Sequence, residues 1–147
     1  MRRLLAVLSV VVAACGKDTS GPSLPKLNGS WSGNWWNLSG GGLSNCETAG
    51  GLQLSITQNG ATFTGGYSSG TIGCNGSIIG TFPAGQIVNG SVNGSVVTLD
   101  LDTPDYHQTG TIIADPGTRM SGTATWRYVD STGTVHLLTG NWGASQQ

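Results

Sequence analysis

The sequence predicts an all-β protein, an antiparallel up-and-down meander that closes into a barrel of eight to nine strands. Short stretches of alternating apolar and polar residues recur along the chain, and turn dipeptides such as Asn59-Gly60 and Asn93-Gly94 separate them. After residue 15, no stretch has the i, i+3, i+4, i+7 apolar spacing of an amphipathic helix. The chain has 147 residues, with 25 Gly and only 13 charged side chains (6 basic and 7 acidic). This length predicts a single domain that can bury a core.

The N-terminus has the pattern of a secretory signal. Arg2 and Arg3 precede an apolar run at 4–14, and this run is shorter than the ~20 apolar residues that a membrane-spanning helix needs. The run ends in Val-Ala-Ala-Cys at 12–15, which resembles the lipobox of bacterial lipoproteins. An ordinary secretory signal followed by an incidental cysteine is the alternative.

The lipobox resemblance implies a division of the N-terminal part of the chain. Residues 1–14 would be a signal peptide that is removed, and Cys15 would carry the lipid that anchors the protein to a membrane. Two or three acyl chains make such anchoring effectively permanent. Gly16 follows the cysteine in place of the Asp that resembles an inner-membrane retention signal, so we expect a lipid-anchored location in the bacterial cell envelope, at the outer membrane.

The remaining chain divides by composition. Residues 15–27 contain two Pro and no periodic apolar pattern, which predicts a flexible tether. The strand signals place the barrel domain at 28–144 and leave a short polar tail at 145–147.

Nine strands are predicted in the domain. Most connections between them are short and sequential, which favours a meander. The strands are expected at 29–36, 51–58, 61–67, 76–82, 86–92, 95–102, 106–114, 119–129 and 133–142.

The three cysteines are consistent with this arrangement. If Cys15 carries lipid, Cys46 and Cys74 remain as a pair in an oxidising compartment, which predicts a disulfide. In the meander both lie in connections at the same end, so a bridge is sterically plausible. Two free thiols or a metal site are the alternatives, but neither His107 nor His136 stands in a Cys/His metal-binding spacing.

Six predicted strands carry a Gly in the middle of their apolar face. Because Gly weakens a strand, its recurrence needs a reason, and sharp bending of strands around a barrel supplies one. The alternative is a two-sheet β-sandwich in which the glycines admit Trp rings from the facing sheet. An odd count of nine also conflicts with a closed antiparallel barrel. The six faces are Trp31-Gly33-Trp35, Phe63-Gly65-Tyr67, Ile78-Gly80-Phe82, Val88-Gly90-Val92, Met120-Gly122-Ala124-Trp126 and Leu138-Gly140-Trp142.

The first strand begins with Gly29-Ser30-Trp31, which resembles the Gly-x-Trp signature of lipocalins, and the Gly/Thr/Trp texture of the domain is similar to that of avidin-like barrels. These resemblances imply a small ligand-binding type of barrel whose first Trp plugs a closed end. The chain departs from lipocalins because its final strand has no Arg and no helix follows it. The ligand-binding residues of avidins do not map onto the chain, so biotin binding is not implied.

Aromatic residues are the candidate ligand contacts. They could line a cavity for a small apolar or glycan-like ligand, or they could simply fill the core. Trp36 points away from its neighbour Trp35 and is a candidate exposed aromatic. The candidate contacts are Trp31, Trp35, Tyr67, Trp126 and Trp142.

Other chemistry is not indicated. The net charge of −1 gives no nucleic-acid footprint. No nucleophile elbow, zinc-protease motif or P-loop is present, so we expect no enzyme, no catalytic residue and no cofactor. Asp100, Asp102 and Asp105 could supply half of a Ca²⁺ site, but such carboxylates more often keep a sheet soluble, and no metal is expected.

Two functions remain open. The first is a lipid-anchored envelope lipoprotein whose barrel binds a small apolar or glycan-like ligand. The second is a non-catalytic structural or interaction lipoprotein with a fully packed barrel that docks an envelope partner of unknown identity.

Overall fold

The computed structural model describes residues 23–49, 51–102, 106–114 and 118–147, and these form eleven antiparallel strands and no helix. The strands are β1 (Gly29–Gly40), β2 (Leu43–Ala49), β3 (Leu52–Asn59), β4 (Thr62–Tyr67), β5 (Gly70–Cys74), β6 (Ser77–Phe82), β7 (Gly85–Asn93), β8 (Val96–Leu101), β9 (His107–Ala114), β10 (Thr118–Val129) and β11 (Val135–Gln146). Within the described residues, no helix is long and apolar enough to cross a membrane.

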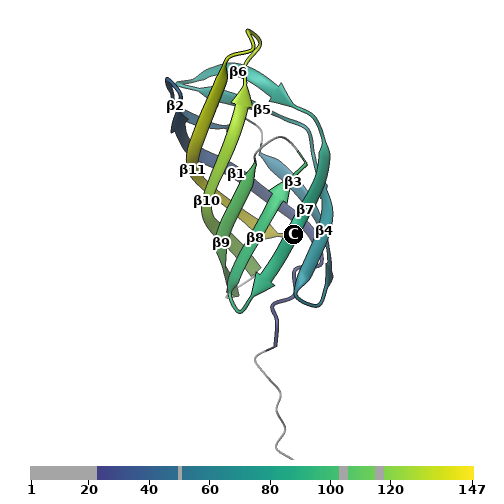
Figure 1. Ribbon diagram of the computed structural model, residues 1–147. Coiled ribbons are helices and arrows are strands. Elements are labelled where there is room, and N and C mark those ends of the chain that lie inside the picture. Colours follow the sequence, from purple (N-terminus) through teal and green to yellow (C-terminus); the bar gives the residue numbers. More distant parts are fainter. Residues whose placement is uncertain (1–22, 50, 103–105, 115–117) are drawn as a thin grey trace, which may run out of the picture.

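Eight strands close into a ring (Figure 1). Going round it, β1 pairs with β3, then β4, β7, β8, β9, β10 and β11 follow, and β11 pairs back onto β1. The predicted all-β meander barrel is confirmed. The odd count of nine predicted strands no longer conflicts with closure, because the predicted strand at 76–82 (β6) lies outside the ring and eight remain.

The other three strands form what we call the side sheet, in the order β2-β5-β6. It is built from the two long connections, β1 to β3 and β4 to β7, and it joins the ring through pairing of β2 with the end of β1. The strands β2 and β5 were not predicted. The predicted disulfide is confirmed, since Cys46 and Cys74 are bonded to each other across the β2–β5 pair.

Two predicted face assignments are wrong. Ile78 is 69% exposed rather than inward, although Phe82, which shares its predicted face on β6 of the side sheet, is buried. In β7, Gly90 and Val92 are buried as predicted, but earlier in the strand the buried residue is Ile87, and Val88 is only half-buried. The reason is a β-bulge between Val88 and Ser91, where Asn89 has a φ of 51°. The extra residue moves the residues that follow it onto the other face of the strand.

The glycines on the inner face allow neighbouring strands to approach closely. A Cβ added to Gly65 would overlap the carbonyl oxygen of Ser55, and one added to Gly122 would overlap that of Thr109. At these two ring positions the nearest atoms are backbone atoms of the adjacent strand, whereas at Gly80 of the side sheet an added Cβ would meet the side chain of Tyr128. The backbone contacts in the ring are the expectation for sharply bent barrel strands and not for a sandwich.

The two ends of the barrel differ. At the tether end, where residues 23–28 enter β1, the Trp31 indole N–H donates to the Leu27 carbonyl (2.8 Å), and the Leu27 N–H donates to Gln58 Oε1 (2.8 Å). Trp31 and Leu27 are fully buried and plug this end. At the opposite, side-sheet end, the Tyr128 hydroxyl of β10 donates to the Ile79 carbonyl of β6 (2.9 Å) and holds the side sheet against the ring.

Candidate functional site

An aromatic cluster fills the barrel beside the side sheet. Its centre is Trp35, whose ring centroid lies 5.1 Å from Phe82, 5.1 Å from Tyr106 and 5.4 Å from Trp126. Tyr67 joins the cluster through Phe82, at 6.5 Å. All five side chains are buried, and they come from β1, β4, β6, β10 and the residue before β9.

The structure therefore brings together only three of the five candidate ligand contacts: Trp35, Tyr67 and Trp126. Trp31 lies at the tether end, and Trp142 lies against β9, where its indole N–H donates to the Thr109 carbonyl (3.0 Å). The sequence analysis did not predict Phe82 or Tyr106 as site residues, nor Tyr128, whose ring centroid lies 5.3 Å from that of Trp126. Phe82 was on a predicted inward face, which was the signal that could have found it.

Two polar atoms in this cluster lack a hydrogen-bond partner among the described residues, Trp35 Nε1 and the Tyr106 hydroxyl. Burial raises the pKa of Tyr106 well above its usual range, although the nearby Trp35 and Gln108 side chains act in the opposite direction. Gln108 is itself buried. An unpaired buried polar group costs about 1–3 kcal/mol of stability. A water molecule or a ligand atom that hydrogen-bonds to Trp35 Nε1 or the Tyr106 hydroxyl would therefore stabilise the protein.

Tyr67 is turned toward the rim of the barrel. Its hydroxyl donates to Asp102 Oδ1 (2.9 Å), and burial together with this carboxylate raises its pKa to about 12. The Tyr67 hydroxyl therefore stays protonated, and its proton is already donated to Asp102.

A second polar cluster lies at the tip of the β10–β11 hairpin. His136 is bonded through Nδ1 to the Gly41 carbonyl (2.8 Å) and through Nε2 to Asp130 Oδ2 (3.0 Å). Hydrogen bonds from His136 and Thr132 hold the pKa of Asp130 well below its usual value, and those to Asp130 and Gly41 raise the pKa of His136. The carboxylate also accepts the backbone N–H groups of Thr132 and Thr134, so it is committed to the turn.

The predicted cluster of aspartates does not converge. Asp100 is bonded to His107 and Asn89, whereas Asp102 is bonded to Tyr67. Partial burial would raise the pKa of Asp100, but the hydrogen bonds from Asn89 and His107 outweigh it and lower the pKa. Asp105 lies outside the described residues, and within the described part of the chain no three His, Cys, Asp or Glu side chains gather as metal ligands.

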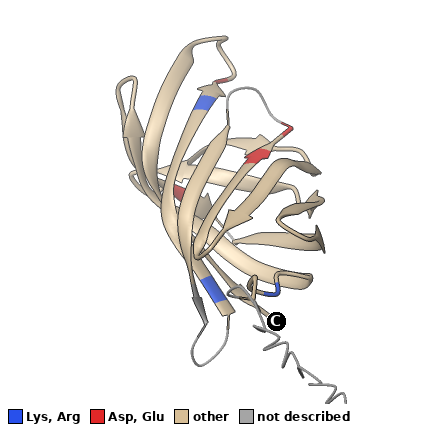
Figure 2. Cartoon of the chain, turned by 60° about the horizontal axis from the view of Figure 1, so that its bottom comes forward, with Lys and Arg blue, Asp and Glu red and all other residues tan. Residues whose placement is uncertain are grey.

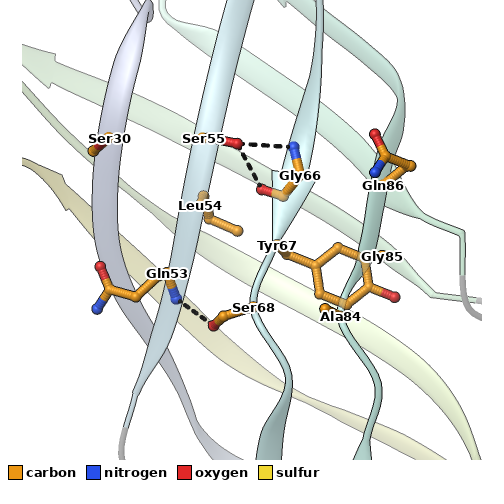
Figure 3. A pocket seen from close by; sticks show the side chains of 10 residues that line it. All are labelled: Ser30, Gln53, Leu54, Ser55, Gly66, Tyr67, Ser68, Ala84, Gly85 and Gln86. Atoms are coloured by element: carbon orange, nitrogen blue, oxygen red, sulfur yellow. Dashed lines mark hydrogen bonds between the residues drawn. The ribbon is translucent and has the colours of Figure 1, made fainter.

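The outer wall has a polar groove across β1, β3, β4 and β7 (Figure 3), with a volume of about 500 Å³. Its hydroxyls are engaged by the sheet itself. Ser55 exchanges hydrogen bonds with the backbone of Gly66, and Ser68 accepts the backbone N–H of Gln53. Of the polar side chains that line the groove, those of Ser30 and Gln86 have no hydrogen-bond partner within the described residues.

Two other outer features matter. Few of the described side chains are charged (Figure 2). On the β10–β11 hairpin, Val129 and Val135 face each other across the two strands and Leu137 is their diagonal neighbour, so three exposed apolar side chains lie together at the end far from the tether.

The structure thus defines a closed eight-stranded antiparallel barrel with a disulfide-linked side sheet. No family model matches the chain, and neither a curated protein nor a solved structure matches it.

Proposed function

We propose that the chain is a lipid-anchored, non-catalytic protein of the bacterial cell envelope, at the outer membrane, whose filled barrel acts through its outer surface. The observation that carries this proposal is the packing of the interior. Trp31, Trp35 and Trp142 are at most 1% exposed, and each contacts another protein group: Leu27, Phe82 and Thr109 respectively. An eight-stranded barrel is narrow enough for its own side chains to fill it.

The anchor part of the proposal rests on the Val-Ala-Ala-Cys sequence behind Arg2 and Arg3. The disulfide between Cys46 and Cys74 supports an oxidising compartment, because such bonds persist outside the cytosol. With Cys46 and Cys74 paired, Cys15 is the remaining cysteine of the three in the sequence.

The anchor is tested by fractionating cells that produce the full chain or its Cys15→Ser variant. The parent should remain with the outer membrane at high salt, and the variant should be released into the soluble fraction. A variant that stays membrane-bound at high salt contradicts the lipid anchor.

The filled barrel is tested by native mass spectrometry of the full-length protein purified from its own envelope. We expect the mass of the acylated chain without an added small molecule. A reproducible adduct that survives purification contradicts the filled barrel.

A second candidate is a barrel that holds a small ligand in its interior, and the unpaired Trp35 Nε1 and Tyr106 hydroxyl favour it. Such a ligand would have an apolar body for the surrounding rings and one hydrogen-bonding oxygen. The Tyr106→Phe variant separates the two candidates. It should leave a filled barrel equally or more stable, whereas it should weaken retention of an interior ligand.

A further inference from the structure

The side chain of Trp36 lies outside the barrel interior. In β1 it points outward, because its neighbour Trp35 points inward, and it is only partly buried. Its ring lies over β11 at Gly143, where an added Cβ would be 3.1 Å from Trp36 Cη2. The missing side chain at Gly143 therefore makes room for the indole on the outer wall.

The indole borders a hollow of about 360 Å³ that spans β10, β11 and β1. This volume is at the lower end of the range of about 300–1,000 Å³ that small-molecule sites occupy. Gly33 and Gly143 contribute no side chain to the hollow. Its polar side chains are Ser32, Asn34, Arg119, Ser121 and Ser145.

The polar groups of the hollow include a tryptophan indole N–H, which the lining of the groove in Figure 3 lacks. The indole N–H groups of Trp31 and Trp142 donate to backbone carbonyls, but that of Trp36 donates to no residue that the structure describes. The side chains of Asn34 and Ser121 likewise make no hydrogen bond within the described residues, while Ser32 accepts one from Gln53. The hollow thus combines a partly exposed aromatic ring with free neutral donors and acceptors and one cation.

We propose that this hollow binds a sugar ring of a glycan. A pyranose has an apolar face of C–H groups and an edge of hydroxyls. The face would pack on the Trp36 indole, and the edge would meet the amide of Asn34 and the hydroxyl of Ser121. Arg119 would favour a saccharide that carries a carboxylate, because a guanidinium forms paired hydrogen bonds with that group.

The alternatives fit the hollow less well. A lipid chain would meet a polar rim, and an extended proline-rich peptide would need an aromatic-lined groove, whereas the hollow has the single indole of Trp36. Trp36 could also serve only to cover Gly143, as aromatic side chains do for glycines in sheets. That role predicts a change in stability without saccharide binding.

The inference rests on the proposed function, since it assigns the acting surface of the filled barrel. The test uses the full lipidated chain, labelled with ¹⁵N, in a detergent without sugar headgroups. Each Trp indole N–H gives one NMR signal, and the signal that disappears in Trp36→Phe identifies Trp36. Probes are chitotetraose, maltotetraose, a hyaluronan tetrasaccharide that carries carboxylates, and a proline-rich peptide.

We expect at least one saccharide at ~10 mM or below to shift the Trp36 indole signal and to leave that of Trp35 in place. The backbone amide signals of Gly33 and Gly143, which line the hollow, report binding in variants without the indole. By this measure Trp36→Ala should weaken binding at least 10-fold, and Trp36→Phe should retain part of it. Arg119→Gln should weaken only the acidic tetrasaccharide. Leu137→Ala is the matched control, because Leu137 is exposed on the same strand as Gly143 but does not line the hollow, and it should bind like the parent.

The remaining four indole signals report whether Trp36→Ala is folded, and Trp36→Phe supplies the comparison if it is not. No shift at Trp36 with any saccharide overturns the inference, as does a shift caused only by the peptide or a shift at Trp35 in place of Trp36. None of these results bears on the anchor, which the Cys15→Ser fractionation decides separately.

Discussion

Cys46 and Cys74 are register partners in the β2–β5 pair, and their disulfide joins the two long connections of the barrel. One connection leads from β1 to β3 and the other from β4 to β7, so the bond links segments that the ring itself does not pair. The disulfide therefore fastens two strands of the side sheet to each other, whereas β1 and Tyr128 attach the side sheet to the ring.

Removing the disulfide should lower stability and leave the barrel intact. The bond closes a loop with a sequence separation of 28, for which the chain-entropy model gives about 3–4 kcal/mol. Because β2 and β5 lie outside the ring, the Cys46→Ala/Cys74→Ala variant should keep its β-sheet circular dichroism and melt at a lower temperature. Non-reducing peptide mapping of the exported parent should find the two cysteines linked. Two alkylatable thiols, or an unchanged melting temperature in the variant, would contradict the assignment.

The ring could be predicted because its signals are local. Alternation of apolar and polar residues and the Asn-Gly turns fix most ring strands within about two residues at their starts, although β11 continues to Gln146, past the predicted end at 142. The side sheet could not be predicted in the same way. The segments Leu43–Ala49 and Gly70–Cys74 are short and polar or Gly-containing, and they become strands by pairing with each other across a long separation.

The candidate site was predicted only in part, for a similar reason. A period of two is enough to place Trp35 and Trp126 on an inner face. It does not reveal that Tyr106 lies against Trp35, or that their polar atoms lack partners, because both facts depend on how distant strands close the ring. Ile78 shows the limit most clearly, because its strand lies outside the ring and buries only Phe82 of the predicted inward face, while Ile78 is exposed.

Gly122→Ala should destabilise the barrel more than Gly66→Ala. A Cβ at Gly122 overlaps backbone atoms of Thr109 and Gly110, which cannot move without distorting β9, whereas one at Gly66 meets Ser55 Oγ at 3.4 Å. Overpacking of this kind costs about 1–3 kcal/mol. Urea denaturation of both variants measures the difference. Equal stability of the two would mean that the close approach of β9 and β10 is wrong.

Tyr128→Phe should loosen the side sheet without loosening the ring. The substitution removes the hydrogen bond to the Ile79 carbonyl, which contributes about 0.5–1.5 kcal/mol. Amide hydrogen exchange should become faster in β6 and change little in β9. Tyr67→Phe is the matched control, because it removes a Tyr hydroxyl bonded to Asp102 and not to the side sheet. Faster exchange in β6 in both variants would show that Tyr128 does not hold the side sheet.

The last prediction concerns the pH dependence of the His136–Asp130 pair. His136 donates through both ring nitrogens only when it is protonated, and its hydrogen bonds to Asp130 and Gly41 raise its pKa above the ordinary value of 6.5. A raised folded-state pKa means that this contribution to stability is complete below pH 6.5 and is lost as the pH rises through the folded-state pKa.

The pKa of Asp130 is lowered from 3.8, so its contribution is present above pH 3.8 and is lost as the pH falls toward the folded-state value. The pair should therefore stabilise the protein most between about pH 4 and pH 6.5. Urea denaturation at a series of pH values, with NMR titration of the His136 ring, measures both limits. Asp100 also has a lowered pKa and will add to the acidic limit, so the alkaline limit is the specific one. His136→Gln keeps a side chain that can donate to Gly41 but cannot titrate, and it should abolish the alkaline loss. If His136→Gln retains that loss, or if the His136 ring titrates below pH 6.5, the imidazolium does not join the hairpin tip to the β1–β2 turn.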